Sequence, residues 1–261
     1  MQRIVAFLYG IACYGAFFAT FLYAIGFLGN FGVPKSIDSG ADGSIVSALA
    51  IDGALLGVFA LQHSIMARPW FKRAWTRLVP APVERSTYVL FSSAALLLVF
   101  WQWRPIGGVV WSVNSAAAQS AILGLYAAGL LIVLLSTFLI NHFDLFGLRQ
   151  VWFYLTRRPY THLEFRTPFF YRYVRHPLYV GWLLTFWSAP VMTVAHLFFA
   201  VMTTAYILVA IRFEEADLIS HHGEAYRRYR SQVPMLVPSL RDREVPESYV
   251  APKSRGAAAS R

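Results

Sequence analysis

Long apolar segments constrain the fold of this chain more than any other feature of its sequence. A helix needs about 20 apolar residues to cross the roughly 30 Å hydrocarbon core of a bilayer. Four long apolar segments and two shorter ones follow one another, at about residues 4–29, 45–67, 88–103, 116–140, 178–189 and 197–211. Because a spanning segment must pair its own backbone polar groups, we expect helices. The predicted fold is an all-α, polytopic membrane bundle of five or six spans, in which the last two segments form a tight hairpin.

The distribution of charge predicts how the chain sits in the membrane. Only 14% of the residues are charged, whereas soluble domains have about a quarter. A net charge of +10 in a soluble protein would indicate nucleic-acid binding, but here Lys and Arg gather between apolar runs, at 68–85, 149–175 and 227–230. The other long loops hold only Lys35 and Arg104. By the positive-inside rule the basic side and both termini are cytoplasmic, and we predict no nucleic-acid partner.

The chain is expected to form one membrane domain, residues 1–240, followed by a tail. Residues 241–261 are small and polar with mixed charge, which predicts a disordered cytoplasmic tail. The single cysteine, Cys13, allows neither an intrachain disulfide nor a cysteine-based metal site. The histidine spacings fit neither zinc nor haem, so we predict no metal.

The densest polar and aromatic block of the chain is centred on Pro177, where a cytoplasmic segment enters the membrane. Proline lacks an N–H, and its ring clashes with the carbonyl of the residue four positions earlier, which therefore loses its helical hydrogen bond. If a helix continues through Pro177, the Tyr173 carbonyl is left free. If a helix begins there, the N–H groups of its first turn are free instead. Such groups are tolerated at membrane depth only beside protein or a wet cavity, so both alternatives predict a polar site beside Arg175, His176 and Tyr179.

Adjacent carboxylates at Glu214 and Glu215 mark the place where the last apolar run leaves the membrane. Neighbouring carboxylates repel one another unless cations lie near, and the predicted hairpin would return them to Arg175 and His176. The alternative is an ordinary charged helix end at the interface. We expect a separate charged amphipathic helix over about 214–230.

Taken together, these blocks resemble the isoprenylcysteine carboxyl methyltransferase superfamily, membrane enzymes that use S-adenosyl-L-methionine. The matching residues are Arg175-His176-Pro177-x-Tyr179-x-Gly181, Glu214-Glu215, Gly223-x-x-Tyr226-x-x-Tyr229 and Val233-Pro234. Four further stretches extend the resemblance to a bacterial branch, the methanethiol S-methyltransferases, at 33–38, 61–64, 84–88 and 141–150. The resemblance implies methylation of a small volatile thiol, methanethiol to dimethyl sulfide, in the bacterial inner membrane, with a cytoplasmic active site in a cofactor-binding cap. It leaves the oligomeric state open.

The resemblance also implies which residues bind the cofactor. Arg175 and Arg166 could offer an arginine fork to its carboxylate, and Glu214 could accept from its ammonium or ribose hydroxyls. The aromatic faces of Tyr171 and Tyr179 suit a sulfonium. The full implied set is Leu163, Glu164, Phe165, Arg166, Tyr171, Arg175, His176, Pro177, Leu178, Tyr179, Glu214 and Glu215. Over 163–166, the implied adenine slot, the sequence departs from the prenyl-group enzymes.

A thiol attacks as its thiolate, so a base or a cation is expected near the sulfur. The candidates are His142, Asp144, His63 and Arg212. We rank His142 and Asp144 first because they follow the fourth apolar segment in an aromatic stretch. His63 could instead close a pocket or cap a helix end. Methylation rates measured against pH for His142→Ala and Asp144→Ala test the first two.

Two other functions stay open at this stage. A related methyltransferase could act on a lipid or a prenyl-cysteine, which requires a broad lateral groove. The bulky aromatics favour a smaller pocket; they are Phe143, Phe146, Trp152, Phe153, Phe169 and Phe170. A non-catalytic transporter or sensor could use the basic loops for topology alone, and binding of S-adenosylhomocysteine would exclude it.

Overall fold

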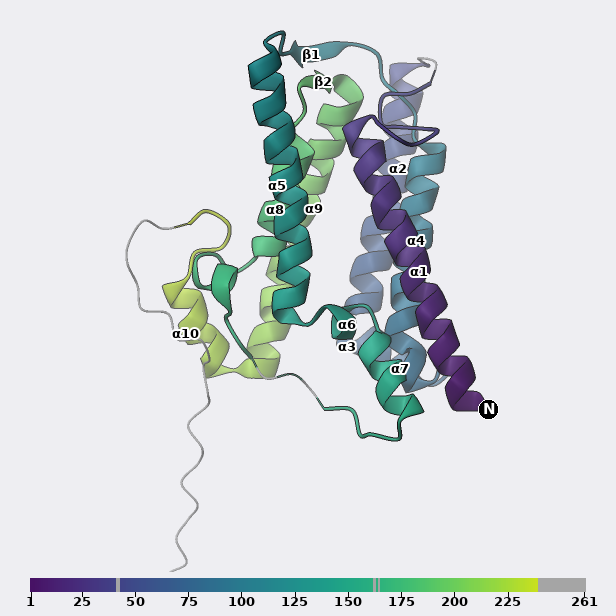
Figure 1. Ribbon diagram of the computed structural model, residues 1–261. Helices are drawn as coiled ribbons and strands as arrows, with labels where there is room; N and C mark the ends of the chain where they lie inside the picture. The colour runs from purple at the N-terminus through teal and green to yellow at the C-terminus, as the bar shows by residue number, and fades with distance from the viewer. Residues whose placement is uncertain (41–42, 162, 164, 239–261) are drawn as a thin grey trace, which may run out of the picture.

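Five long helices form the body of the structure, a computed structural model that describes residues 1–40, 43–161, 163 and 165–238 (Figure 1). They are α1 (Gln2–Gly29), α2 (Ile45–Ala67), α4 (Ala81–Gln102), α5 (Ala116–Ile140) and α9 (Val194–His222). Each is long and apolar enough to cross a membrane. The predicted all-α membrane bundle is confirmed, and the protein is a multi-pass membrane protein. The tail predicted at 241–261 lies outside the described residues.

The helices are arranged as a ring. Going round it, α1 packs on α4, α4 on α2, α2 on α9, and α9 on α8 (Pro177–Trp187), which packs on α5. The Tyr126 hydroxyl of α5 donates to the Ile25 carbonyl of α1 at 2.6 Å and closes the ring. At 1.5 Å per residue, the 11 residues of α8 rise only about 16 Å. Helix α8 therefore covers only about half of the hydrocarbon thickness between α5 and α9. Among the described residues, five helices and not six are long enough to span the membrane.

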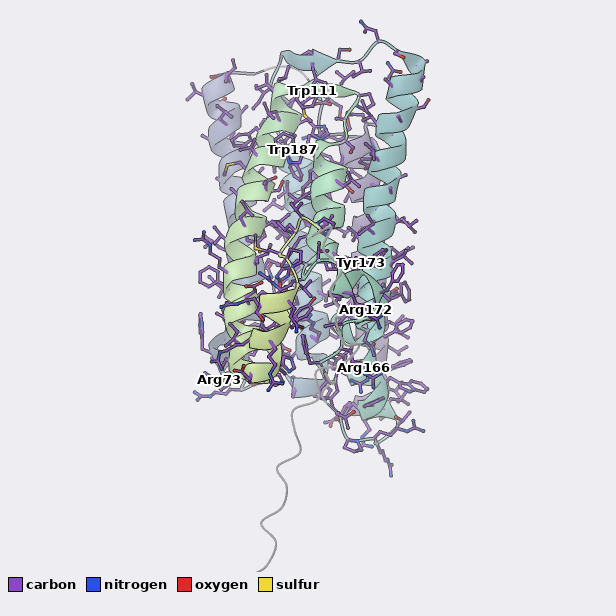
Figure 2. All side chains as sticks on the ribbon, turned by 90° about the vertical axis from the view of Figure 1, so that its left-hand side faces the viewer. Arg73, Trp111, Arg166, Arg172, Tyr173 and Trp187 are labelled. Atoms are coloured by element: carbon purple, nitrogen blue, oxygen red, sulfur yellow. The ribbon has the colours of Figure 1, made fainter. Side chains whose placement is uncertain are left out.

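Shorter elements gather at the two ends of the ring. The end of the ring at which the chain's N-terminus lies carries α3 (Pro69–Trp75), α6 (His142–Leu145), α7 (Leu148–Leu155) and α10 (Glu224–Gln232). The 3₁₀ helix η1 (Phe169–Arg172) precedes α8. At the other end β1 (Val109–Ser112) pairs antiparallel with β2 (Val191–Thr193), a pairing the sequence did not predict. Figure 2 places Arg73 and Arg166 near one end and Trp111 near the other.

The prediction of a separate amphipathic helix over 214–230 is wrong. Helix α9 continues without a break to His222, so Glu214 and Glu215 lie inside it. The break comes at Gly223, whose φ of +57° is open to glycine and costly for other residues. Its N–H still bonds the Ile219 carbonyl, and α10 starts at the next residue. The hairpin of α8 and α9 is confirmed.

Aromatic and aliphatic side chains close the half of the ring next to the strands. Phe27, Phe100, Trp103 and Phe199 belong to one buried cluster that joins α1, α4 and α9. The Trp103 indole donates to the Ile37 carbonyl at 3.1 Å and so fastens the first loop to this cluster. The half of the ring next to the strands is therefore packed mainly by apolar side chains.

Buried Asp52 has a structural role at this sealed end. Its Oδ1 accepts the Arg104 N–H at 2.9 Å, directly after α4 ends. The carboxylate thus satisfies a backbone N–H in the turn that follows a spanning helix.

Two glycines set the distance between α5 and α8. A Cβ built on Gly181 would lie 2.6 Å from the Gly129 carbonyl oxygen and 2.8 Å from the Val133 nitrogen. Small residues let helix backbones approach closely in membranes, where apolar burial alone gives little association. This contact holds α8, and with it the turn at Pro177, against the wall of the ring.

Replacing Gly181 by alanine should destabilise the bundle. The added methyl group overlaps backbone atoms of α5 that cannot rotate away, so we expect the free energy of unfolding to fall by about 1–3 kcal/mol. Thermal unfolding in detergent micelles measures it. Gly124→Ala on α5 is the matched control, since its Cβ would meet no described atom within 4 Å; there helix propensity should stabilise by about 0.5–1 kcal/mol. Equal effects of the two substitutions would contradict the close contact.

Candidate functional site

The site begins at the N-terminus of α8. Of the two alternatives for Pro177, the structure adopts the second: the helix starts at Pro177, with His176 as its N-cap. Proline suits the first helical position because it brings no N–H that needs a partner. The N–H groups of Leu178 and Tyr179 precede the first possible helical acceptor, and no side chain in the described part of the chain caps this turn. The turn therefore presents free donors and the positive end of a helix dipole.

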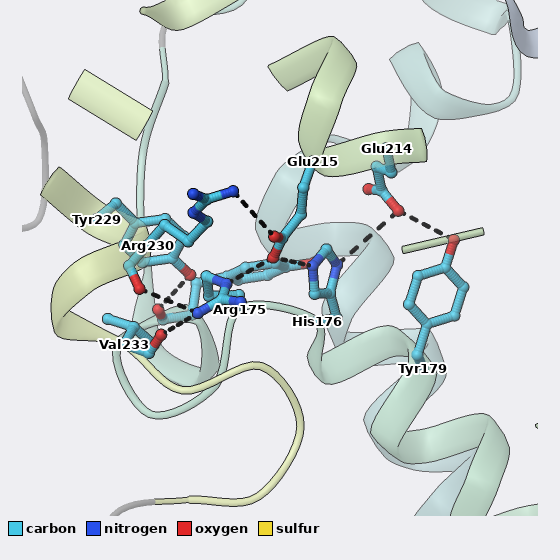
Figure 3. A network of polar contacts seen from close by, with 9 residues as sticks. Arg175, His176, Tyr179, Glu214, Glu215, Tyr229, Arg230 and Val233 are labelled. Atoms are coloured by element: carbon cyan, nitrogen blue, oxygen red, sulfur yellow. Dashed lines mark hydrogen bonds and ion pairs between the residues drawn. The ribbon is translucent and has the colours of Figure 1, made fainter. Parts of the chain in front are cut away.

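Glu215 connects this turn to α9 and α10 (Figure 3). Its Oε1 accepts from Arg175 Nε at 2.7 Å and lies 3.1 Å from His176 Nε2. The Arg230 guanidinium lies 3.9 Å from the other oxygen. The Glu215 side chain is only 11% exposed. The cations expected beside the paired carboxylates are present, and the predicted meeting of the Pro177 turn with this part of α9 is confirmed.

Glu214, the other carboxylate, is much more open. Its side chain is 43% exposed, and its Oε2 accepts from the Tyr179 hydroxyl at 3.0 Å. His176 Nδ1 lies 3.8 Å from the same oxygen, so the imidazole sits between the two carboxylates (Figure 3). Successive helix residues point about 100° apart. Glu215 thus binds side chains of the protein itself, whereas Glu214 keeps an accessible oxygen.

Arg175 points into the protein rather than toward an open site. Its Nη1 donates to the carbonyls of Val233 at 2.5 Å and Arg230 at 3.1 Å, in addition to the Glu215 bond. Its backbone N–H donates to the Pro234 carbonyl at 2.9 Å. The Arg175 guanidinium, predicted to bind a cofactor carboxylate, is therefore largely occupied by Glu215 and by carbonyls at the end of α10.

An aromatic cluster formed by Phe165, Tyr226 and Tyr229 packs beside the site. The Phe165 ring lies 5.6 Å from that of Tyr226 and 5.4 Å from that of Tyr229. The Tyr229 hydroxyl donates to the Tyr171 carbonyl at 2.7 Å, which ties α10 to η1. Burial, with the Glu214 carboxylate nearby, raises the pKa of Tyr171 and keeps its phenol protonated. Of the implied adenine slot, Phe165 joins this cluster, Leu163 is exposed, and Glu164 lies outside the described residues.

The two base candidates ranked first are engaged elsewhere. His142 bonds the Tyr14 hydroxyl through Nε2 and the Thr137 hydroxyl through Nδ1, both at 2.8 Å. The residue is 6% exposed, and burial lowers its pKa, so the ring is neutral at pH 7. Asp144 pairs with Arg149 at 2.8 Å. Both belong to α6, whose neighbours are α5 and α7.

The other two candidates lie on spanning helices. Arg212 is exposed on α9, two residues before Glu214. His63 lies on α2, half-buried, with the Tyr88 hydroxyl 2.9 Å from Nε2 and the Ser92 hydroxyl 3.1 Å from Nδ1. The structure thus separates the four candidates over three regions.

Two contributors to the site were not recognised as such from the sequence. Arg230 and the segment 233–236 close it from the α10 side, where Met235 and Leu236 pack against the core. The His176 N–H donates to the Met235 carbonyl at 3.3 Å. Val233-Pro234 was visible as part of a motif, but motif spacing cannot say that its carbonyls receive hydrogen bonds from residues almost 60 positions earlier.

Comparison with known proteins adds a family context to this geometry. Residues 120–225 match the phospholipid methyltransferase family. The chain is 61% identical to methanethiol S-methyltransferase of Crocosphaera subtropica, over 92% of this chain and 94% of that protein. It is 50% identical to the protein of the same name in Mycobacterium tuberculosis, over 91% and 98% of the two chains. Nurim of Xenopus laevis is 28% identical over 79% and 80%. No solved structure matches the chain.

Neutralising Glu215 should loosen the layer formed by α10 and 233–236. Glu215→Gln removes the charge that Arg175, His176 and Arg230 share, and hydrogen bonds to charged groups contribute about 1.5–3 kcal/mol. We expect that loss in the free energy of unfolding and faster proteolysis after α10. Glu224→Gln is the control: its carboxylate is 63% exposed and lies 3.7 Å from Arg227, and exposed pairs contribute about 0–1 kcal/mol. Similar losses for both variants would contradict the central role of Glu215.

Proposed function

The chain belongs to the methanethiol S-methyltransferase family, and we propose that it transfers a methyl group from S-adenosyl-L-methionine to the sulfur of methanethiol, which gives dimethyl sulfide. Six relatives of that name are 46–61% identical to it, over 82–98% of the chain, so the protein is a methyltransferase. The observation that carries the proposal is the meeting of the α8 N-terminus with the open carboxylate of Glu214.

The donor set of this site fits the polar parts of S-adenosyl-L-methionine. The free N–H groups of Leu178 and Tyr179 suit a carboxylate at a helix N-terminus. The accessible oxygen of Glu214 suits an ammonium or ribose hydroxyls. The Tyr171 and Tyr179 side chains add aromatic surface, which a sulfonium tolerates well. When bound, S-adenosyl-L-methionine supplies a methyl group on a positively charged sulfur, and the protein's task is to orient it and to exclude water.

The basic end of the ring faces the cytoplasm in this proposal. Arg73, Arg166 and Arg172 lie toward the end that carries the site (Figure 2), and Lys and Arg accumulate on the cytoplasmic side of membrane proteins. A water-soluble methyl donor would then reach the site directly, because it is made and used on that side. The membrane is the bacterial inner membrane.

Aromatic crowding inside the ring favours a small acceptor. The Phe17 and Phe146 rings stack at 3.9 Å, and Phe21 meets the edge of Trp182 at 5.9 Å. These contacts join α1 to the α6–α7 connection and to α8. A volatile thiol of two heavy atoms needs no groove for a long acyl or prenyl chain and partitions into lipid by itself.

The activity is tested by headspace detection of dimethyl sulfide from membranes that contain the chain. Methanethiol and S-adenosyl-L-methionine together should give the product, and omission of either should abolish it. A prenyl-cysteine and phosphatidylethanolamine serve as competing acceptors. Methylation of one of these, without dimethyl sulfide, would overturn the substrate assignment.

Glu214→Gln should weaken the binding of S-adenosylhomocysteine by tenfold or more. The substitution keeps the size of the side chain but removes the charge that accepts from the ligand, and a charged hydrogen bond contributes about 1.5–3 kcal/mol, where about 1.4 kcal/mol is tenfold. Titration calorimetry on purified protein measures the affinity, and Glu224→Gln is the charge-matched control. Unchanged affinity in Glu214→Gln would remove this residue from the cofactor site.

A further inference from the structure

A second polar cluster lies inside the ring, on the opposite wall from α8. It consists of His63 on α2 with Tyr88 and Ser92 on α4, and we refer to it as the His63 cluster. The Tyr88 hydroxyl is 2.9 Å from His63 Nε2, and the Ser92 hydroxyl is 3.1 Å from Nδ1. Tyr88 and Ser92 are buried. Ionisable groups within spanning helices are costly and mark functional sites in membrane proteins.

The His63 cluster faces the Glu214 end of the candidate site. The His63 ring stacks on Phe59 at 5.3 Å, and Phe59 meets the edge of Tyr206 at 6.2 Å. Tyr206 lies on α9, about two turns before Glu214, and its hydroxyl is 3.1 Å from that of Ser64. Tyr179, whose hydroxyl bonds Glu214, lies near Tyr206 and Tyr88. The cluster and the carboxylate thus border the same part of the ring interior.

His63 is more exposed than His142. Asp52, Leu56, Phe59, His63 and Met66 recur every three or four residues and form one face of α2, which packs toward α4 and α9. On this inward face His63 is half-buried and keeps exposed atoms.

By contrast, His142 is enclosed. Its ring stacks on Phe138 at 4.3 Å, both nitrogens bond hydroxyl groups, and 6% of the residue is exposed. Both histidines bond hydroxyl groups through their two ring nitrogens, and by exposed surface His63 is the more open of the two.

Positive charge next to the His63 cluster would favour an anionic sulfur. The Arg85 guanidinium lies 4.9 Å from the centre of the Tyr88 ring, held by a 2.7 Å bond from Nε to the Leu145 carbonyl. It acts electrostatically on both His63 and Tyr88, and Arg68 acts on Tyr88 from the same end. The ionisable groups facing the cluster are therefore these two arginines, Tyr206 of α9 and Tyr179 of α8. A cation close to a thiol stabilises its thiolate.

We propose that the His63 cluster binds the thiol and removes its proton, which deepens the proposed function and rests on it. The thiol proton passes to the Tyr88 oxygen while the Tyr88 hydroxyl proton moves to His63 Nε2. The thiolate electron pair forms the new sulfur–carbon bond at the methyl group. The old carbon–sulfur bond breaks, and its electron pair stays on the sulfur of S-adenosylhomocysteine. His63 then releases the proton to water, so one thiol and one sulfonium give one sulfide, one thioether and one proton.

Tyr88→Phe and His63→Gln should each lower methyl transfer to methanethiol by about 100-fold at pH 7, since a positioned base contributes about 10²–10⁴-fold. The loss should shrink as pH rises, because solution then supplies thiolate. It should also shrink with 2,2,2-trifluoroethanethiol, a small thiol that ionises more easily. Affinity for S-adenosylhomocysteine should stay within twofold of the unmodified protein, which also shows that the variants fold. Tyr126→Phe, which removes another buried tyrosine hydroxyl from a spanning helix, is the matched control.

Two results would overturn the proposal. One is activity close to that of the unmodified protein in both variants. The other is a loss that is the same at every pH and for both thiols, which indicates a packing role. If His142→Gln alone gives the pH-dependent loss, the base lies on α6 instead. If the unmodified protein forms no dimethyl sulfide, the proposed function itself is rejected. This result is obtained before any variant is measured, so the two failures can be told apart.

Discussion

The buried carboxylate of Glu215 is the interaction on which the rest of the site depends. It receives Arg175 and His176 from the start of α8 and Arg230 from α10. A carboxylate this far from water is stable only with such partners, so the three elements must come together for any of them to be placed. Arg175 extends the connection to the carbonyls of 230 and 233. A single anion thus joins α9 to Arg175, 40 residues before it, and to Arg230 of α10.

Because Glu215 compensates the nearby cations, its neighbour Glu214 can stay open. The two side chains point in different directions from one helix, and His176 lies between them. The separation of a structural carboxylate from a binding carboxylate follows from helix geometry alone, and it holds only because α9 continues through both residues.

The ring of helices has two different halves, and this asymmetry suits a small apolar thiol. Near the strands, Phe27, Trp103 and Phe199 seal the interior. Toward the basic end, tyrosine hydroxyls, His63 and Glu214 line it, and their hydrogen bonds replace those that water would give. A sulfur nucleophile can be deprotonated by such positioned groups next to the methyl donor. The short helix α8 makes this possible, since a full span would fill the inner half with apolar side chains.

Local properties of the sequence were enough for the membrane character, the spanning helices and the residues of the Pro177 turn. The runs 45–67 and 116–140 coincide with α2 and α5 because hydropathy and helix length are set by neighbours along the chain. Glu214 and Arg175 were identified by residue type and motif. Their different uses were decided only by tertiary structure: Arg175 turns inward because carbonyls of 230 and 233 come to it, and Glu214 stays open because Glu215 takes the cations. Sequence spacing also favoured His142, whose hydroxyl partners on α1 and α5 appear only in the folded ring. Pairings between distant segments depend on how helices pack, and no local pattern of residues records that.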